Sequence, residues 1–138
     1  MRTRIVLLSV LAVAGAAQAQ SFPAKPVRII VGFAAGGPTD VIARVMAQDM
    51  TASMGQSVIV ENRTGANAII ATDLVARAAP DGYTTLFSSL SLLVNAILSP
   101  DKLKYDPFKD FAPVSNAAVL PQLIVPRPSP PVNSWKEL

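Results

Sequence analysis

The fold of this chain is decided by the stretch Val31-Gly32-Phe33-Ala34-Ala35-Gly36-Gly37-Pro38-Thr39-Asp40. It follows the apolar run Val27–Val31 and precedes a segment whose apolar residues recur at helical spacing. This order predicts a strand, a glycine turn and the start of a helix, with Gly37 as the N-cap and Pro38 as the first helical residue. A helix N-terminus exposes backbone N–H groups and carries partial positive charge, so such a turn can hold an anion.

Strand-like and helix-like patterns alternate along the chain. Strands are predicted at 27–31, 58–60 and 83–87, and helices at 38–54 and about 68–79, with a third helical stretch that opens at 88–91 and runs to about residue 98. This alternation predicts an α/β fold with a mostly parallel sheet covered on both faces, in which ligands bind beyond the carboxyl ends of the strands. Two further strands are predicted at 114–119 and 122–125, and a helix start at Ser134.

Apolar residues at helical spacing are expected to face the sheet. In the first helix these residues are Val41, Ile42, Val45, Met46 and Met50, and in the second they are Ile69, Ile70, Leu74 and Val75.

The N-terminus predicts export. A basic start, Met1–Arg4, precedes the ten apolar residues Ile5–Ala14 and the cleavage motif Ala17-Gln18-Ala19. Ten residues are too few to cross a bilayer comfortably, so residues 1–19 are predicted to be a signal peptide and not an anchor. We therefore expect a periplasmic protein with no membrane insertion after cleavage.

Composition excludes several kinds of chemistry. Without the signal peptide, ten basic residues face nine acidic ones, and with no long basic run we expect no nucleic-acid partner. The chain has no histidine and no cysteine, which excludes the common triads and zinc sites. The glycine spacing fits neither a P-loop nor a dinucleotide fingerprint. We therefore predict no catalytic residue, no metal site and no cofactor.

Three turns are expected to meet where parallel strands end, and their backbone N–H groups and short polar side chains could hold a carboxylate. The candidate ligand-binding residues are Phe33, Ala34, Ala35, Gly36, Gly37, Pro38, Thr39, Asp40, Asn62, Gly65, Ala66, Asn67, Ser88, Ser89 and Ser91. Purely structural roles stay open for several of them. Gly36 and Gly37 could serve a tight turn, Asp40 the helix dipole, Asn62 an Asx turn, and the serines a helix cap.

Ordered blocks along the chain carry a family resemblance. They are Phe22–Val31, Phe33–Asp40 with Ala43-Arg44, Val60–Arg63 with Gly65-Ala66, Ala76–Thr84, Tyr105–Val114 and Ser134–Leu138. Taken in this order, they resemble the first lobe of the substrate-binding receptors of tripartite tricarboxylate transporters, often called Bug proteins. Asn67, Ala68 and Ala71 stand where glycines are frequent in that family.

The resemblance implies a type II periplasmic-binding-protein fold, with residues 20–120 as the first α/β lobe. Residues 121–138 would be a crossing segment and the truncated start of a second lobe that is otherwise absent. It also implies a non-catalytic receptor that binds a small carboxylate, through the residues of 33–40 first of all, and delivers it to a membrane permease.

Two other functions stay open on the residues alone. One is an exported interaction or structural protein, or a fragment that binds no ligand, because an unpaired cleft face exposes apolar surface. The other is a hydrolase or isomerase that works without histidine.

Overall fold

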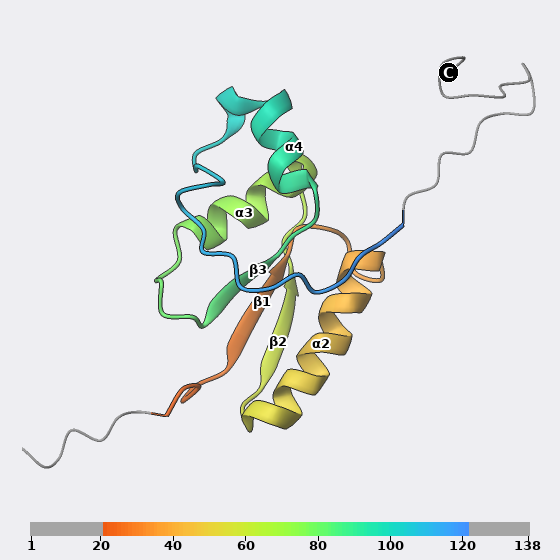
Figure 1. The fold of residues 1–138 in the computed structure, drawn as a ribbon, viewed down its shortest axis with the longest axis vertical. Coiled ribbons are helices and arrows are strands. Elements are labelled where there is room, and N and C mark those ends of the chain that lie inside the picture. Colours follow the sequence, from red (N-terminus) through yellow and green to blue (C-terminus); the bar gives the residue numbers. More distant parts are fainter. Residues whose placement is uncertain (1–20, 122–138) are drawn as a thin grey trace, which may run out of the picture.

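A computed structural model describes residues 21–121 of the chain. Its strands are β1 (Val27–Val31), β2 (Val58–Asn62) and β3 (Thr84–Phe87), and its α-helices are α2 (Pro38–Met54), α3 (Ile69–Ala76) and α4 (Ser91–Leu98). Two single-turn 3-10 segments, Ala66–Ala68 and Pro100–Lys102, flank α3 and α4 (Figure 1). The predicted α/β lobe with flanking helices is confirmed.

The three strands form one parallel sheet in the order β2-β1-β3. Val27 pairs with Val58 at one end of the β1–β2 ladder and Val31 with Asn62 at the other. Val31 also pairs with Phe87 of β3. Because all three strands run the same way, their carboxyl ends meet at one edge of the sheet, which we call the rim.

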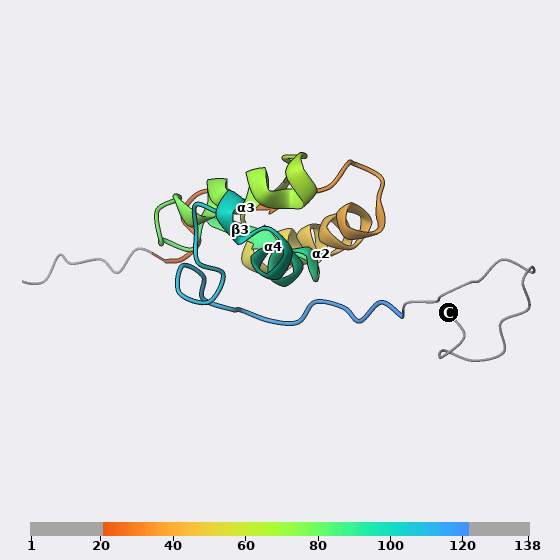
Figure 2. The ribbon, with the colours of Figure 1, turned by 90° about the horizontal axis from the view of Figure 1, so that it is seen from above.

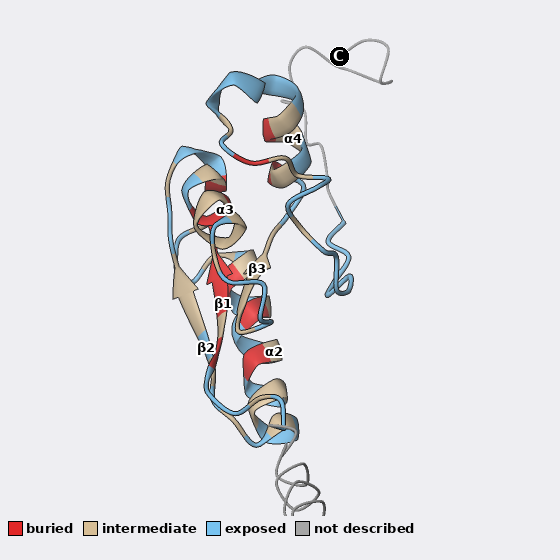
Figure 3. Ribbon diagram, turned by 90° about the vertical axis from the view of Figure 1, so that its left-hand side faces the viewer, coloured by how far each residue is buried: buried red, intermediate tan, exposed pale blue. Residues whose placement is uncertain are grey.

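Helices cover the two faces of the sheet (Figure 2). On one face, Ile29 and Val31 of β1 pack against Ala43 and Ala47 of α2. Side chains alternate along a strand, so Ile30 points to the opposite face, where α3 packs against β1 and β3. The buried residues accordingly gather on β1 and on the facing sides of the helices (Figure 3).

The predicted inward faces of two helices are partly wrong. Val41 and Val45 are 51% and 58% exposed, and Ile70 is 53% exposed. The buried residues of α2 are Asp40, Ala43 and Ala47. Small alanines let the helix approach the sheet closely, and this rotation turns the valines outward while Ile42, Met46 and Met50 stay half-buried. In the same way α3 buries Ala71 and Thr72, so Ile70 faces solvent.

The strand predicted at 114–119 is also wrong. Residues 111–121 run as an extended chain that crosses the α2 side of the sheet (Figure 1), and within the described range they join no ladder. A strand is stabilised by backbone bonds to a neighbour, and this segment crosses the face of the sheet instead of following an edge. The signal peptide 1–19, the strand 122–125 and the helix start at Ser134 lie outside the described residues.

No helix among residues 21–121 is long and apolar enough to span a bilayer.

Candidate functional site

Three turns lie side by side at the rim. The first turn, 33–40, follows the central strand β1; the second, 62–68, follows β2; and the third, 88–91, follows β3. The structure therefore brings together all three segments from which a ligand site was predicted. The first turn lies between the other two because β1 lies between β2 and β3.

The first turn is fixed by the carboxylate of Asp40, which is only 2% exposed. One oxygen, Oδ2, accepts the Gly36 N–H at 2.8 Å and Arg44 Nε at 2.9 Å, and the other, Oδ1, accepts Asn62 Nδ2 at 2.8 Å. The guanidinium of Arg44, and then the Gly36 N–H and the Asn62 amide, hold the pKa of Asp40 far below its ordinary value. Asp40 is therefore ionised at neutral pH and clamps the first turn in that form.

Asn62 extends this clamp from β2 to the first turn. Its Nδ2 also donates to the Phe33 carbonyl at 3.0 Å, and its Oδ1 accepts Arg44 Nη2 at 3.0 Å. The side chains of Asp40 and Asn62 thus bond to one another and to the turn. They position the first turn, and a direct ligand contact by either of them stays a prediction.

The clamp leaves the tip of the first turn open. Ala34, Ala35 and Gly36 are exposed, and Gly36 has a φ of +81° with nothing within 4 Å of where a Cβ would lie. Gly37 N–H donates to the Ala34 carbonyl at 3.3 Å, which closes the turn. The N–H of Thr39 lies in the first turn of α2, after Pro38, and has no intrahelical acceptor there. The N–H groups of Ala34, Ala35 and Thr39 are the neutral donors that a carboxylate at the rim would need.

The second turn is held by strained backbone. Ala66, Asn67 and Ala68 have φ values of +48°, +54° and +71°, in the left-handed region that L-residues seldom occupy in succession. Gly32, just after β1, makes room for this turn: a Cβ there would lie 2.2 Å from the Ala68 Cβ. Ala68 is therefore buried against Gly32, while the predicted site residues Ala66 and Asn67 are exposed.

Asn95 ties the second turn to α4. Asn67 Nδ2 donates to Asn95 Oδ1 at 2.9 Å, and Asn95 Nδ2 donates back to the Asn67 carbonyl at 2.8 Å. Sequence reasoning missed Asn95 and Arg44. The signals for them were a lone amide in an otherwise apolar helical stretch, and an arginine four residues after Asp40.

The third turn leads into α4. Ser89 Oγ accepts the Ser91 N–H at 3.4 Å and donates to Ser91 Oγ at 3.2 Å, while Ser88 Oγ donates to the Ser89 carbonyl at 3.2 Å. Ser91 is buried and Ser89 is exposed. Leu90 is the N-cap residue of α4 and no side chain caps the helix, so Ser89 Oγ bonds only to Ser91, and Ser88 is half-buried at the rim.

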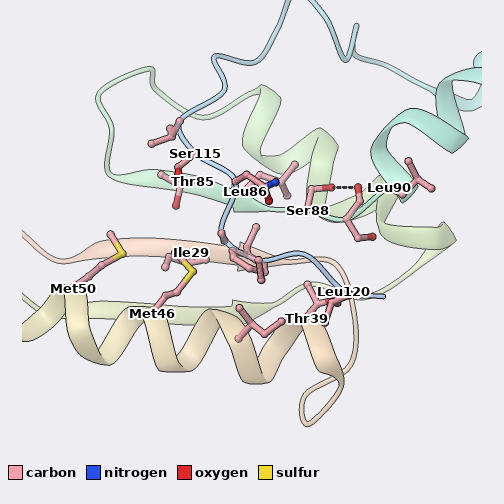
Figure 4. Close-up of a pocket in the computed structure, with 17 residues that line it drawn as sticks. Ile29, Thr39, Met46, Met50, Thr85, Leu86, Ser88, Leu90, Ser115 and Leu120 are labelled. Carbon is pink, nitrogen blue, oxygen red and sulfur yellow. Dashed lines mark hydrogen bonds between the residues drawn. The ribbon is translucent and has the colours of Figure 1, made fainter. Parts of the chain in front are cut away.

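A cavity of about 700 Å³ lies between α2, the sheet and the extended segment 111–121 (Figure 4). Thr39, Ser88 and Leu120 lie at its rim end and Met50 at its far end. Sequence reasoning missed this cavity, because its walls are residues that the helical pattern assigns to an ordinary core. Residues 21–121 contain no cluster of three or more acidic side chains that could hold a metal ion.

Comparisons of the sequence with known proteins agree on one family. Residues 42–138 match the model of the tripartite tricarboxylate transporter family receptor. The chain is 40% identical to protein BugT of Bordetella pertussis over 135 residues, which are 96% of this chain and 41% of BugT. It is 42% identical to a UPF0065 protein of Bordetella bronchiseptica over 89% of this chain and 37% of that protein. The chain thus spans about two fifths of the length of these relatives.

Two solved structures are similar to the described lobe. A structure of a periplasmic transporter superposes with a TM-score of 0.67 at 46% identity, over 70% of this chain and 32% of its own. MatC from Rhodopseudomonas palustris, solved with bound malate, superposes with a TM-score of 0.58 at 40% identity, over 67% of this chain and 32% of its own.

Proposed function

This chain belongs to the tripartite tricarboxylate transporter receptor family, which is a family of transport receptors and not of enzymes, and we propose that its rim binds the carboxylate of a small organic acid. The observation that carries the proposal is the open first turn: Ala34 and Ala35 are exposed just beyond the carboxyl end of β1, and a buried clamp fixes the turn. The bound malate of MatC supports it, because MatC shares this lobe at 40% identity.

The clamp explains why the donors are backbone groups. Asp40 is ionised and would repel the carboxylate of a ligand, but its charge is balanced by Arg44 and by hydrogen bonds from Asn62 and the Gly36 N–H. The remaining N–H groups of the first turn and of the start of α2 then face the solute with the positive end of the helix dipole behind them. A bond from such a donor to a charged acceptor contributes about 1.5–3 kcal/mol.

Membership of the family supports a receptor role for this chain. In our proposal the chain works in the periplasm after removal of residues 1–19 and presents its solute to a membrane permease. The described lobe supplies one wall of the site. Because the relatives are more than twice as long as this chain, we expect the lobe by itself to bind with a roughly millimolar dissociation constant.

Titration of the chain with pairs of ligands tests the proposal. Malate, adipate and hexanoate are each compared with their uncharged primary amides by NMR or calorimetry. We expect the acids to bind and the amides not to bind, because the amides lack the charge that strengthens bonds from the backbone donors. Equal affinity for acid and amide would contradict the proposal.

A pair of substitutions at one position isolates a backbone donor. Thr39→Pro removes one N–H in the first turn of α2, where proline is tolerated, whereas Thr39→Ala keeps that N–H and loses only the side chain. We expect Thr39→Pro to weaken acid binding roughly tenfold and Thr39→Ala to change it little. The melting temperature of each variant checks that α2 still begins at the same place.

A further inference from the structure

The cavity is continuous with the proposed binding site. Thr39 and Ser88 line its rim end and also belong to the first and third turns (Figure 4). Helix α2 runs away from the rim and rises 1.5 Å per residue, so Met46 lies about 10 Å along the helix from Thr39. A ligand whose head is held at the rim would therefore have its other end directed between α2 and the sheet.

The walls of the cavity carry no charge. Ile29, Met46, Met50 and Phe87 supply apolar surface, and the only polar side chains in the lining are hydroxyls and the amide of Asn116. A second carboxylate inside the cavity would lose part of its hydration without meeting a cation, which is unfavourable. An apolar group would instead gain contacts with methionine side chains, which adapt to many shapes.

We infer that this cavity takes the apolar tail of the acid held at the rim, so that the preferred ligand is a monocarboxylate with an aliphatic or aromatic tail. The inference rests on the proposed function, because it needs the carboxylate to be held by the turns. It separates this chain from MatC, whose ligand malate carries two carboxylates.

Two acids of equal length test the inference. Hexanoate and adipate have six carbons each, and only adipate has a carboxylate where hexanoate has a methyl group. We expect the chain to bind hexanoate at least about tenfold more tightly than adipate. From butanoate to octanoate, each added methylene should tighten binding up to about fourfold. Tighter binding of adipate, or no dependence on tail length, would overturn the inference.

Substitutions on opposite walls of the cavity place a cation inside it. Met46→Lys and Ser115→Lys should each shift the preference from hexanoate toward adipate, because the ammonium meets the second carboxylate. The matched control is Val45→Lys, on the same helix at a position that is 58% exposed and outside the cavity lining, which should leave the ratio unchanged. Ser115 is exposed in the extended segment, so Ser115→Lys removes no buried apolar group and guards against a folding defect in Met46→Lys.

The amide controls distinguish this inference from the proposed function. If both acids bind better than their amides and hexanoate is not preferred, the tail site is wrong and the carboxylate site stands. If the acids bind no better than the amides, the carboxylate site fails and the tail site fails with it. A preference for hexanoate that is lost in Met46→Lys and Ser115→Lys and kept in Val45→Lys supports both the carboxylate site and the tail site.

Discussion

The first and second turns lie next to each other at the rim, yet they are held in opposite ways. The first turn is fixed by side chains: Asp40 accepts three hydrogen bonds and Asn62 bridges it to β2. The second turn is fixed by backbone, with three successive left-handed residues pressed against Gly32. One edge of a parallel sheet can therefore combine a charged clamp, which depends on pH and on a few polar atoms, with a strained turn that depends on neither.

The largest effect should come from removing the clamp. Asp40→Ala leaves the Gly36 N–H, the Arg44 guanidinium and the Asn62 amide without their shared acceptor, and we expect the melting temperature to fall by roughly 10 °C or more. Acid binding should be lost as well, because the first turn is no longer held. Asp49→Ala, at an exposed position of the same helix, is the control and should change the melting temperature by a degree or two at most, on the order expected for a surface site.

The stability of the second turn should depend on added side-chain volume and not on the loss of a charge. In Gly32→Ala the new Cβ would lie 2.2 Å from the Ala68 Cβ and 2.9 Å from its Cα, so the turn must move, at a cost of about 1–3 kcal/mol in unfolding free energy. Adding Ala68→Gly removes the nearer atom and suits the φ of +71° there, so the double variant should recover part of that loss. Additive losses in the double variant, measured by urea denaturation, would show that the two residues do not press on each other.

Acid should weaken the first turn and the ion pair between β1 and β2. Asp40 has a pKa lowered from 3.8, and Glu61, which pairs with Arg28, has a pKa lowered from 4.5 to about 2. A carboxyl with a lowered folded-state pKa stabilises the fold above its unfolded pKa, and this stabilisation is lost as the pH falls through that value toward the folded one. We therefore expect stability to decline below about pH 5.

Thermal melts from pH 7 to pH 2 measure this decline. The decline should be shallower in Asp40→Asn, which cannot titrate at that position. A variant of the second turn, such as Ala66→Gly, should give a curve parallel to that of the parent chain. If Asp40→Asn followed the parent curve instead, the clamp would not be the source of the acid sensitivity.

The smallest effect should be a gain. Ala66 is exposed at a φ of +48°, so Ala66→Gly relieves left-handed strain without loss of packing and should stabilise the chain by about 0.5–1 kcal/mol. The same change in a regular helix, Ala52→Gly in α2, should destabilise by a similar amount. Opposite signs in the two melts would support the strained-turn description, and a loss in both would contradict it.

The sequence predicts the strands, the helices and the rim of this lobe, but not which residues of α2 are buried or whether residues 114–119 pair with a strand. Turn residues and apolar spacing place the three strands, the three helices and the rim, because these signals are local. The rotation of α2 was missed, since the burial of Asp40 and of the small alanines depends on partners in β1 and β2. The strand at 114–119 was wrong because pairing depends on a neighbour that the pattern does not contain.

The candidate site also has features that the sequence predicts and features that it does not. That the three turns share one edge follows from parallel strands and could be predicted. The partners Arg44 and Asn95, and the cavity beside α2, depend on contacts between residues distant in the sequence. The second turn is intermediate, because Asn67 and Ala68 stand where the similar family often has glycine, and the structure gives both a positive φ.

Amide chemical shifts of the isotopically labelled chain during titration with hexanoate would show directly whether backbone donors at the rim hold the carboxylate. We expect saturable shifts that are largest for the N–H groups of Ala34, Ala35 and Thr39, with Gly55 and Gly82 at the opposite end of the sheet unchanged. Shifts confined to that opposite end, or a first turn that does not respond while other residues saturate, would contradict the claim that backbone donors at the rim hold the carboxylate.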